Sequence, residues 1–147
     1  MSKGSTLIAR LAKTDIVVVP GIYDALSALL AEQAGMEAVF LSGSAVAYSQ
    51  LGRPDIGLVT MSVMVEVCAR ICDRINIPVL VDIDSAFGNA AHAARTIRTL
   101  EMAGAAAVQM EDQLPINPVN DLSGRPLVAP AVMVDKIKAL VLSLIHI

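Results

Sequence analysis

Short apolar runs that stop at Asp or Glu constrain the fold of this chain more than any other feature. Val-Asp-Ile-Asp occupies 81–84, and Met-Glu-Asp-Gln occupies 110–113. Asp82 and Asp84 are two residues apart, so in a strand their side chains point to the same face. Charges at the carboxyl end of an apolar parallel strand are costly to bury unless they are paired or metal-bound. Two such strand ends side by side would form an oxygen-rich pocket suited to Mg²⁺.

Segments with helical spacing alternate with the apolar runs. The runs, each predicted to be a strand, are 16–19, 38–41, 78–81 and 106–110. Helices are expected over 3–13, over 26–33 before Gly35, from Thr60 to Ile75, from 90 to Gly104, and from Pro130 onward. This order is typical of an α/β fold, either a doubly wound sheet or a (β/α)₈ barrel. A complete barrel needs roughly 250 residues, so four strands make about half of one.

The composition argues against several classes of partner. The 147 residues are 55% hydrophobic and 17% charged, with a mean hydropathy of +0.64. No uninterrupted apolar run reaches the roughly 18 residues of a membrane span. Because the net charge is −3 and no basic run occurs, nucleic-acid binding is not expected. The first residues do not have the pattern of a signal peptide. Cys68 and Cys72 are expected to be reduced thiols in the core. Both expectations favour a cytoplasmic location.

Two long connections, 42–59 and 111–129, both follow strands. Connections longer than about 12–15 residues are usually functional, and α/β barrels keep their chemistry on the face where strands lead into such loops. On the last helix, Lys136 and Lys138 are expected to face solvent. The residues expected to face inward are Met133, Ile137, Leu140 and Val141.

Four carboxylates form the strongest candidate site: Asp55, Asp82, Asp84 and Glu111. Each alone has an ordinary interpretation, as a turn residue, a cap or a surface charge. Together they lie at strand ends or in the loops that follow. Mg²⁺ usually takes one or two carboxylates directly and keeps several waters, so one direct ligand is expected and the others would act through water. Such an ion can polarise a 2-oxo-carboxylate and stabilise the enolate formed beside a breaking bond.

A second candidate is the segment Phe40-Leu-Ser-Gly-Ser-Ala45. Small residues directly after a strand expose backbone N–H groups, which can bind a carboxylate or a phosphonate. The signal is weak alone, because Ser-Gly-Ser is a common loop sequence. His92 is expected on an exposed helix turn.

Five stretches in series resemble the isocitrate lyase / phosphoenolpyruvate mutase superfamily. They are Gly21-Ile-Tyr-Asp-Ala-Leu-Ser-Ala-Leu-Leu-Ala, Phe40-Leu-Ser-Gly-Ser-Ala-Val-Ala, Leu51-Gly-Arg-Pro-Asp-Ile-Gly, Val81-Asp-Ile-Asp-Ser-Ala-Phe-Gly-Asn and Met110-Glu-Asp-Gln. The resemblance implies a (β/α)₈ barrel, Mg²⁺ or Mn²⁺ as cofactor, and a homo-oligomeric full-length protein. The implied activity is that of a lyase or mutase, breaking or moving a C–C or P–C bond next to the enolate of a small 2-oxo or 2-hydroxy carboxylate or phosphonate.

The resemblance also implies roles for individual residues. Asp82 looks like the direct metal ligand, and the water-mediated shell would consist of Asp55, Asp84 and Glu111. The residues that would bind the substrate carboxylate are Phe40, Ser42, Gly43 and Ser44.

One stretch departs from the family. Lyase branches carry Lys-x-Cys-Gly-His shortly after the Glu-Asp pair, and the cysteine is the catalytic acid/base; mutase branches keep the lysine and have asparagine at the cysteine position. Counted without gaps, this chain has Asn117, Val119 and Asp121 at the lysine, cysteine and histidine positions. A valine cannot transfer a proton, which argues against a methylisocitrate-lyase mechanism. Mutase, decarboxylase, hydrolase or divergent chemistry remains, and the catalytic residue is unknown.

The chain is expected to be the amino-terminal half of one barrel domain, over 1–141. The residues 142–147, Leu-Ser-Leu-Ile-His-Ile, resemble a translated transposon end and are expected to be a non-native tail left by truncation. Two other hypotheses stay open. The chain could be a non-catalytic fragment that associates with itself through open edges. It could also be a receiver-like Mg²⁺-binding domain, although a receiver needs an acidic pair after its first strand, where this chain has Pro20-Gly21.

Overall fold

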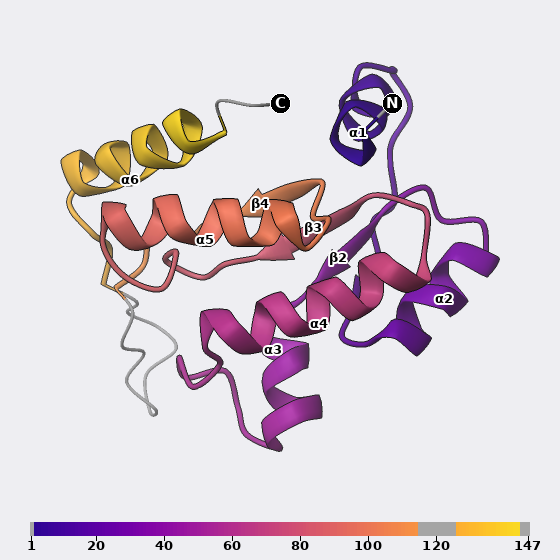
Figure 1. The fold of residues 1–147 in the computed structure, drawn as a ribbon, viewed down its shortest axis with the longest axis horizontal. Coiled ribbons are helices and arrows are strands. Elements are labelled where there is room, and N and C mark those ends of the chain that lie inside the picture. Colours follow the sequence, from indigo (N-terminus) through magenta and orange to yellow (C-terminus); the bar gives the residue numbers. More distant parts are fainter. Residues whose placement is uncertain (1, 115–125, 145–147) are drawn as a thin grey trace.

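The computed structural model of the chain describes residues 2–114 and 126–144. Strands and helices alternate along the chain (Figure 1). The strands are β1 (Gly21–Ile22), β2 (Val39–Leu41), β3 (Val79–Asp82) and β4 (Ala107–Gln109). The helices are α1 (Lys3–Leu11), α2 (Ala25–Gln33), α3 (Gly43–Val46), the π-helical η1 (Ala47–Leu51), α4 (Met61–Arg74), α5 (Ala90–Met102) and α6 (Pro130–Ser143). None of the helices in these ranges is long and apolar enough to cross a membrane.

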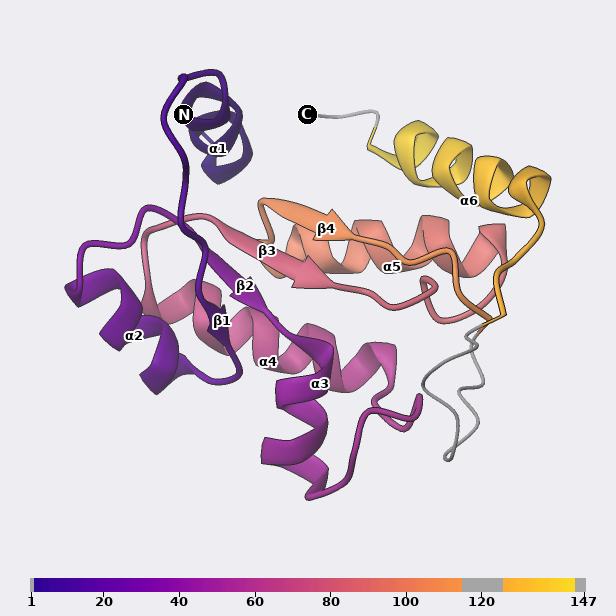
Figure 2. The same ribbon diagram turned by 180° about the vertical axis from the view of Figure 1, so that it is seen from behind.

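The four strands form one parallel sheet in the order β1-β2-β3-β4. Strands that follow one another in the chain are therefore neighbours in the sheet (Figure 2). A doubly wound sheet would place its first strand in the interior, as in the receiver order 2-1-3-4-5. The sequential order among the described strands is that of a barrel, and it argues against the receiver alternative.

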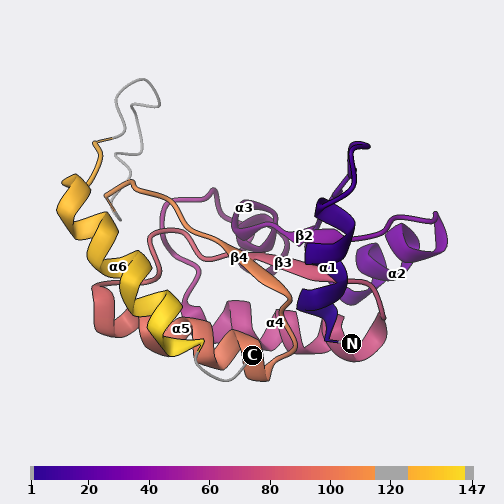
Figure 3. The same cartoon turned by 90° about the horizontal axis from the view of Figure 1, so that it is seen from above.

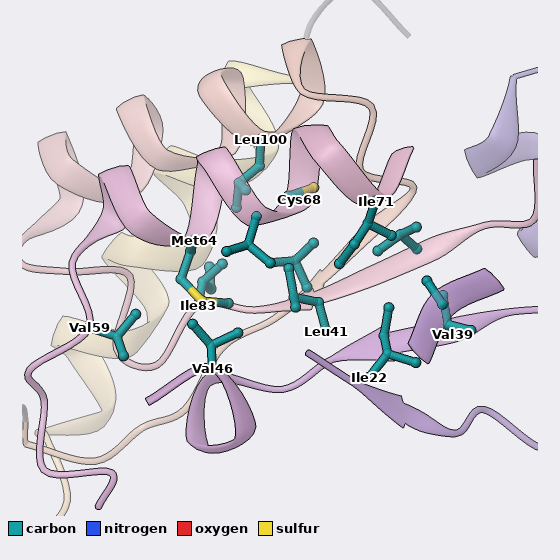
Figure 4. Packing of buried hydrophobic residues seen from close by; sticks show 14 of the residues in the cluster. Ile22, Val39, Leu41, Val46, Val59, Met64, Cys68, Ile71, Ile83 and Leu100 are labelled. Carbon is teal, nitrogen blue, oxygen red and sulfur yellow. The ribbon is translucent and has the colours of Figure 1, made fainter. Parts of the chain in front are cut away.

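One face of the sheet carries the hydrophobic core. In β3, Val79 and Val81 are fully buried, whereas Leu80 between them is only half-buried. The buried face packs against α4 and α5, which lie side by side on one side of the sheet (Figure 3). Leu41 of β2 and Met64 of α4 belong to this core (Figure 4). The half-buried face corresponds to the interior of a closed barrel, which is filled by layers of side chains.

Polar side chains fix where the principal helices begin. The Ser27 N–H donates to Asp24 Oδ1 at 2.7 Å, and the Asp24 N–H donates to the Ser27 hydroxyl at 3.2 Å, which makes a capping box for α2. Thr60 caps α4, as predicted, and Asn89 caps α5. These contacts satisfy amides that the helix itself leaves without an acceptor.

The first strand is shorter and later than predicted. The strand consists of Gly21 and Ile22, which lie opposite Phe40 and Leu41 of β2, and 16–19 is not a strand. Ile16 is 88% exposed and Val18 is 65% exposed. β-branched residues favour a strand when neighbouring side chains pack on them, and this segment precedes a strand at the edge of the sheet. The prediction of a strand over 16–19 is wrong.

The connection over 42–59 contains more structure than its sequence indicates. The short helix α3 begins directly after β2 and continues into η1, so that helical residues occupy 43–51. Ser42 Oγ accepts a hydrogen bond from the Ala45 N–H at 3.3 Å and caps α3.

The last helix buries only part of the predicted face: Leu140 is buried as predicted and Met133 is half-buried. Helix α6 begins at Pro130 as expected and packs along α5 (Figure 1). Its buried residues are Lys136, Leu140 and Ser143. Ile137 is 44% exposed and Val141 is 63% exposed, although both are predicted to face inward. The prediction that Lys136 faces solvent is wrong, since a lysine can bury its stem when its amine finds an acceptor.

Candidate metal and substrate site

Asp82 lies at the carboxyl end of β3, and two backbone amides hold its carboxylate. The Gly43 N–H donates to Oδ2 at 3.2 Å, and the Asp84 N–H donates to Oδ1 at 3.1 Å. The first amide belongs to the start of α3, so Asp82 links the carboxyl ends of β2 and β3. A Cβ added at Gly43 would lie 3.2 Å from Asp82 Oδ2. This close approach therefore favours glycine at position 43.

The segment after β3 has an unusual backbone. Asp84, Ala86 and Phe87 have φ angles of 46°, 65° and 56°, in the left-handed region that costs a residue with a Cβ roughly 1–2 kcal/mol. The Ala86 N–H donates to Ile83 O at 2.7 Å, and the Glu111 N–H donates to Asp84 O at 2.7 Å. Several non-glycine residues in this region close together are characteristic of functional sites.

Negative charge is concentrated around Asp84. Burial raises the pKa of Asp84 to about 7, together with the charges of Asp82, Asp55 and Glu111. The Asp84 N–H donates to Asp82 Oδ1, so these two residues are in direct contact. Asp55, from the loop before α4, and Glu111, from the connection after β4, line the same cavity as Asp84.

A cavity of about 620 Å³ opens beside these carboxylates. Asp55, Asp84 and Glu111 line it, and so do Ser85 and Phe87 from the segment after β3. Asp82 and the predicted substrate-binding segment do not line it. The cavity is therefore adjacent to the predicted site and includes three of its carboxylates.

The predicted substrate-binding segment lies beside Asp82. Phe40 is half-buried in β2, and its N–H donates to Pro20 O at 2.9 Å. The hydroxyl of Ser42 caps α3, the amide of Gly43 contacts Asp82, and Ser44 is half-buried in the first turn of α3. The role of these residues in binding a substrate carboxylate stays a prediction.

The cavity also has polar lining residues that the sequence analysis did not assign to a site. They are Thr60, Ser62, Arg95, Thr96 and Gln113. Thr60 and Ser62 lie at the beginning of α4, Arg95 and Thr96 lie in the middle of α5, and Gln113 lies in the connection after β4. The rule that chemistry follows the carboxyl ends of strands could have directed attention to Thr60, Ser62 and Gln113. His92 is exposed, as predicted, and lines the cavity; its Nδ1 lies 2.9 Å from Asn89 Oδ1 within the cap of α5.

The connection after β4 closes at its base. The Val128 N–H donates to Asp112 O at 2.8 Å, and the Leu114 N–H donates to Pro126 O at 2.9 Å. The positions that depart from the family pattern, Asn117, Val119 and Asp121, lie outside the described residues.

The oxygen donors fit Mg²⁺, which prefers carboxylates and water. Among residues 2–114 and 126–144, no three His, Cys, Asp or Glu side chains are grouped so that they could hold one metal ion. A site with one direct carboxylate and others acting through water needs no such group. Burial is the largest cause of the raised pKa of Asp84, and the repulsion from neighbouring carboxylates that adds to it is one that a divalent cation would relieve.

The fold and the acidic strand ends together define a class of protein. Four β/α units in sequential order, with charged residues at the carboxyl ends of the strands, characterise (β/α)₈-barrel enzymes. A family model described as phosphoenolpyruvate phosphomutase matches residues 8–144. The chain belongs to the phosphoenolpyruvate phosphomutase family, which confirms the superfamily predicted from the sequence.

The chain is similar to known proteins both in sequence and in structure. The chain is 46% identical over 138 residues to 2-methylisocitrate lyase of Aeropyrum pernix, across 94% of this chain and 44% of that protein. It is 38% identical over 141 residues to 2,3-dimethylmalate lyase of Eubacterium barkeri, across 96% of this chain and 49% of that protein. The solved structure of phosphonopyruvate hydrolase in complex with oxalate and Mg²⁺ superposes with a TM-score of 0.86 at 30% identity, across 97% of this chain and 48% of that one.

The chain spans about half the length of the relatives it matches. These relatives are enzymes, and the structural neighbours belong to the same barrel superfamily. The predicted fold, the first four units of a (β/α)₈ barrel within an enzyme family, is confirmed.

Proposed function

We propose that the full-length protein is a Mg²⁺-dependent lyase or mutase. It would cleave or rearrange a C–C or P–C bond next to the enolate of a small 2-oxo or 2-hydroxy acid. The proposal depends mainly on the placement of the carboxylates: Asp55, Asp84 and Glu111 line one cavity, and the Asp84 N–H donates to Asp82 Oδ1 beside it. The relatives support it, because their names describe lyases of small acids and a hydrolase crystallised with oxalate and Mg²⁺.

Each candidate residue has a proposed role. Asp82 would be the direct ligand of Mg²⁺, or of Mn²⁺ in its place, since backbone amides from two strand ends already orient its carboxylate. The residues that would act through water are Asp55, Asp84 and Glu111. When bound, the cation supplies the positive charge that polarises the substrate and stabilises an enolate. The substrate carboxylate or phosphonate would be bound by Phe40, Ser42, Gly43 and Ser44.

The proton-transferring residue is not assigned. Val119 at the family's cysteine position favours mutase, decarboxylase or hydrolase chemistry over a methylisocitrate-lyase mechanism. The full-length protein should therefore be assayed on 2-methylisocitrate and on phosphonopyruvate side by side. Fast cleavage of 2-methylisocitrate would show that another residue transfers the proton.

Isothermal titration of the full-length protein with Mg²⁺ and oxalate, an enolate mimic, tests the proposal. We expect oxalate to bind only when Mg²⁺ is present. Asp82→Ala should weaken cation binding at least about 100-fold, since changes outside the direct ligands already cost about 10–100-fold. Asp73→Ala is the matched control, because it removes one exposed carboxylate on α4 outside the proposed site. Oxalate binding that is absent, or equal in Asp82→Ala and in the control, would overturn the proposal.

We also propose that 1–141 is the amino-terminal half of one barrel domain and that 142–147 is a non-native tail. The relatives, which are about twice as long, support this division. Long-read sequencing of the locus tests it. A reading frame that continues in place of 142–147 with four further strand–helix units is expected, and a genuine stop after Ile147 would contradict it. The full-length enzyme is expected to be a cytoplasmic homo-oligomer.

A further inference from the structure

A buried lysine contacts the segment that carries Asp84. Lys136 lies in the middle of α6 and is only 5% exposed. Its Nζ donates to the backbone carbonyl of Ser85 at 2.8 Å, across 51 positions of sequence. Burial lowers the pKa of Lys136. An amine taken out of water needs an acceptor to offset its lost hydration, and a backbone carbonyl supplies one here.

The acceptor lies at the centre of the left-handed segment. Asp84 precedes Ser85, and Ala86 and Phe87 follow it; all three have positive φ angles. Residues with a Cβ hold such angles only where surrounding contacts determine them. The contacts at the ends of the segment are the Ala86 N–H to Ile83 O bond and the Glu111 N–H to Asp84 O bond. Neither involves the Ser85 carbonyl, which Lys136 fixes from a different helix.

We infer that Lys136 is a positioning residue, which holds the segment 84–87 in its left-handed conformation through the Ser85 carbonyl and thereby orients the Asp84 carboxylate. The inference rests on the proposed cation site for its functional consequence. It connects α6, which packs along α5 (Figure 3), to the acidic strand ends. Neither Lys136 nor α6 lines the cavity beside Asp84, so the effect of Lys136 passes through the backbone.

Lys136→Met in the full-length protein tests the inference, because methionine keeps most of the stem and removes the donor. Amide hydrogen exchange at Ala86 and Glu111 is the first readout and needs no metal. Losing a charged hydrogen bond to a buried carbonyl should speed exchange at both amides by about tenfold or more. Titration with Mn²⁺ is the second readout, and we expect a loss of affinity of about tenfold, as for other residues that orient ligands.

Two control variants separate positioning from general stability. Leu140→Ala removes a buried side chain one turn further along α6 and leaves the amine in place. Lys138→Met removes the same charge from an exposed position of that helix. We expect Leu140→Ala to lower the melting temperature without selectively speeding exchange at Ala86 and Glu111, and Lys138→Met to change neither readout.

Each outcome supports or overturns the inference. Unchanged exchange in Lys136→Met overturns it, and so does equal acceleration in Leu140→Ala at matched global stability. If the wild-type protein fails to bind Mn²⁺, the proposed function fails, while hydrogen exchange still decides whether Lys136 holds the segment. If exchange accelerates but Mn²⁺ affinity stays the same, Lys136 orders the backbone and its claimed effect on Asp84 is overturned.

Discussion

Asp84 should make the metal-free protein less stable as the pH rises from about 4 to about 7. Its pKa is about 7 in the folded protein, against an ordinary value of 3.8. Between these values the folded state keeps a proton that the unfolded chain releases, so the free energy of unfolding falls with rising pH. This loss of stability is absent below the pKa of Asp84 in the unfolded chain and complete above its pKa in the folded protein.

Urea unfolding of the full-length protein and of its Asp84→Asn variant, at several pH values and without divalent cations, measures this effect. Asparagine keeps the shape and cannot ionise. The stability of the variant relative to wild type should therefore increase from pH 4 to pH 7. A difference that stays constant over this range would contradict the raised pKa.

At the scale of single residues, the sequence predicts side chains whose environment leaves a sequence signal. Asp82 and Asp84 could be predicted because an apolar run ends at them. The burial of Lys136 is not predicted because its partner is the backbone carbonyl of Ser85, and a carbonyl 51 positions away has no signature in the sequence. For the same reason, the sequence does not predict that the Gly43 amide donates to Asp82.

At the scale of elements, Asp24 should stabilise α2 through its cap. Its carboxylate accepts the Ser27 amide at 2.7 Å. Asp24→Ala leaves that amide without its acceptor and should cost about 1 kcal/mol in the free energy of unfolding. Urea denaturation of the full-length protein measures the loss, with Gln33→Ala at the exposed end of the same helix as control. Equal stability of Asp24→Ala and wild type would refute the role of the cap.

Helices whose first residues carry a capping or helix-starting signal are predicted correctly from the sequence. Strands and buried helix faces that depend on a packing partner are not. Thr60 and Pro130 mark helix starts in sequence and in structure alike. The prediction of a strand over 16–19 is wrong because strand formation depends on a pairing partner, and the paired register with β2 begins at Gly21. On α6 the burial of Leu140 is predicted correctly, but the exposure of Ile137 and Val141 is not, because burial there follows the contact of α6 with α5.

At the scale of the whole molecule, residues 1–147 expressed alone should associate or precipitate. Within the described residues, β1 and β4 each pair with a single neighbouring strand. Large apolar side chains are also exposed, including Ile16 at 88% and Val18 at 65%. Open strand edges and apolar patches promote association between chains.

Sedimentation velocity and thermal melting of this chain test the prediction. Species larger than a monomer, or loss of protein to aggregates, are expected. A monodisperse monomer with one cooperative transition would show that the described half of the barrel is stable by itself.

The proposed site requires carboxylates from separate segments to converge around one divalent cation. Anomalous X-ray diffraction from crystals of the full-length protein grown with Mn²⁺ and oxalate would locate this cation. We expect a single strong Mn²⁺ peak bound by Asp82, with Asp55, Asp84 and Glu111 around its water ligands. A peak remote from Asp82, or Asp82 and Glu111 more than about 12 Å apart and thus unable to share a hydrated ion, would contradict it.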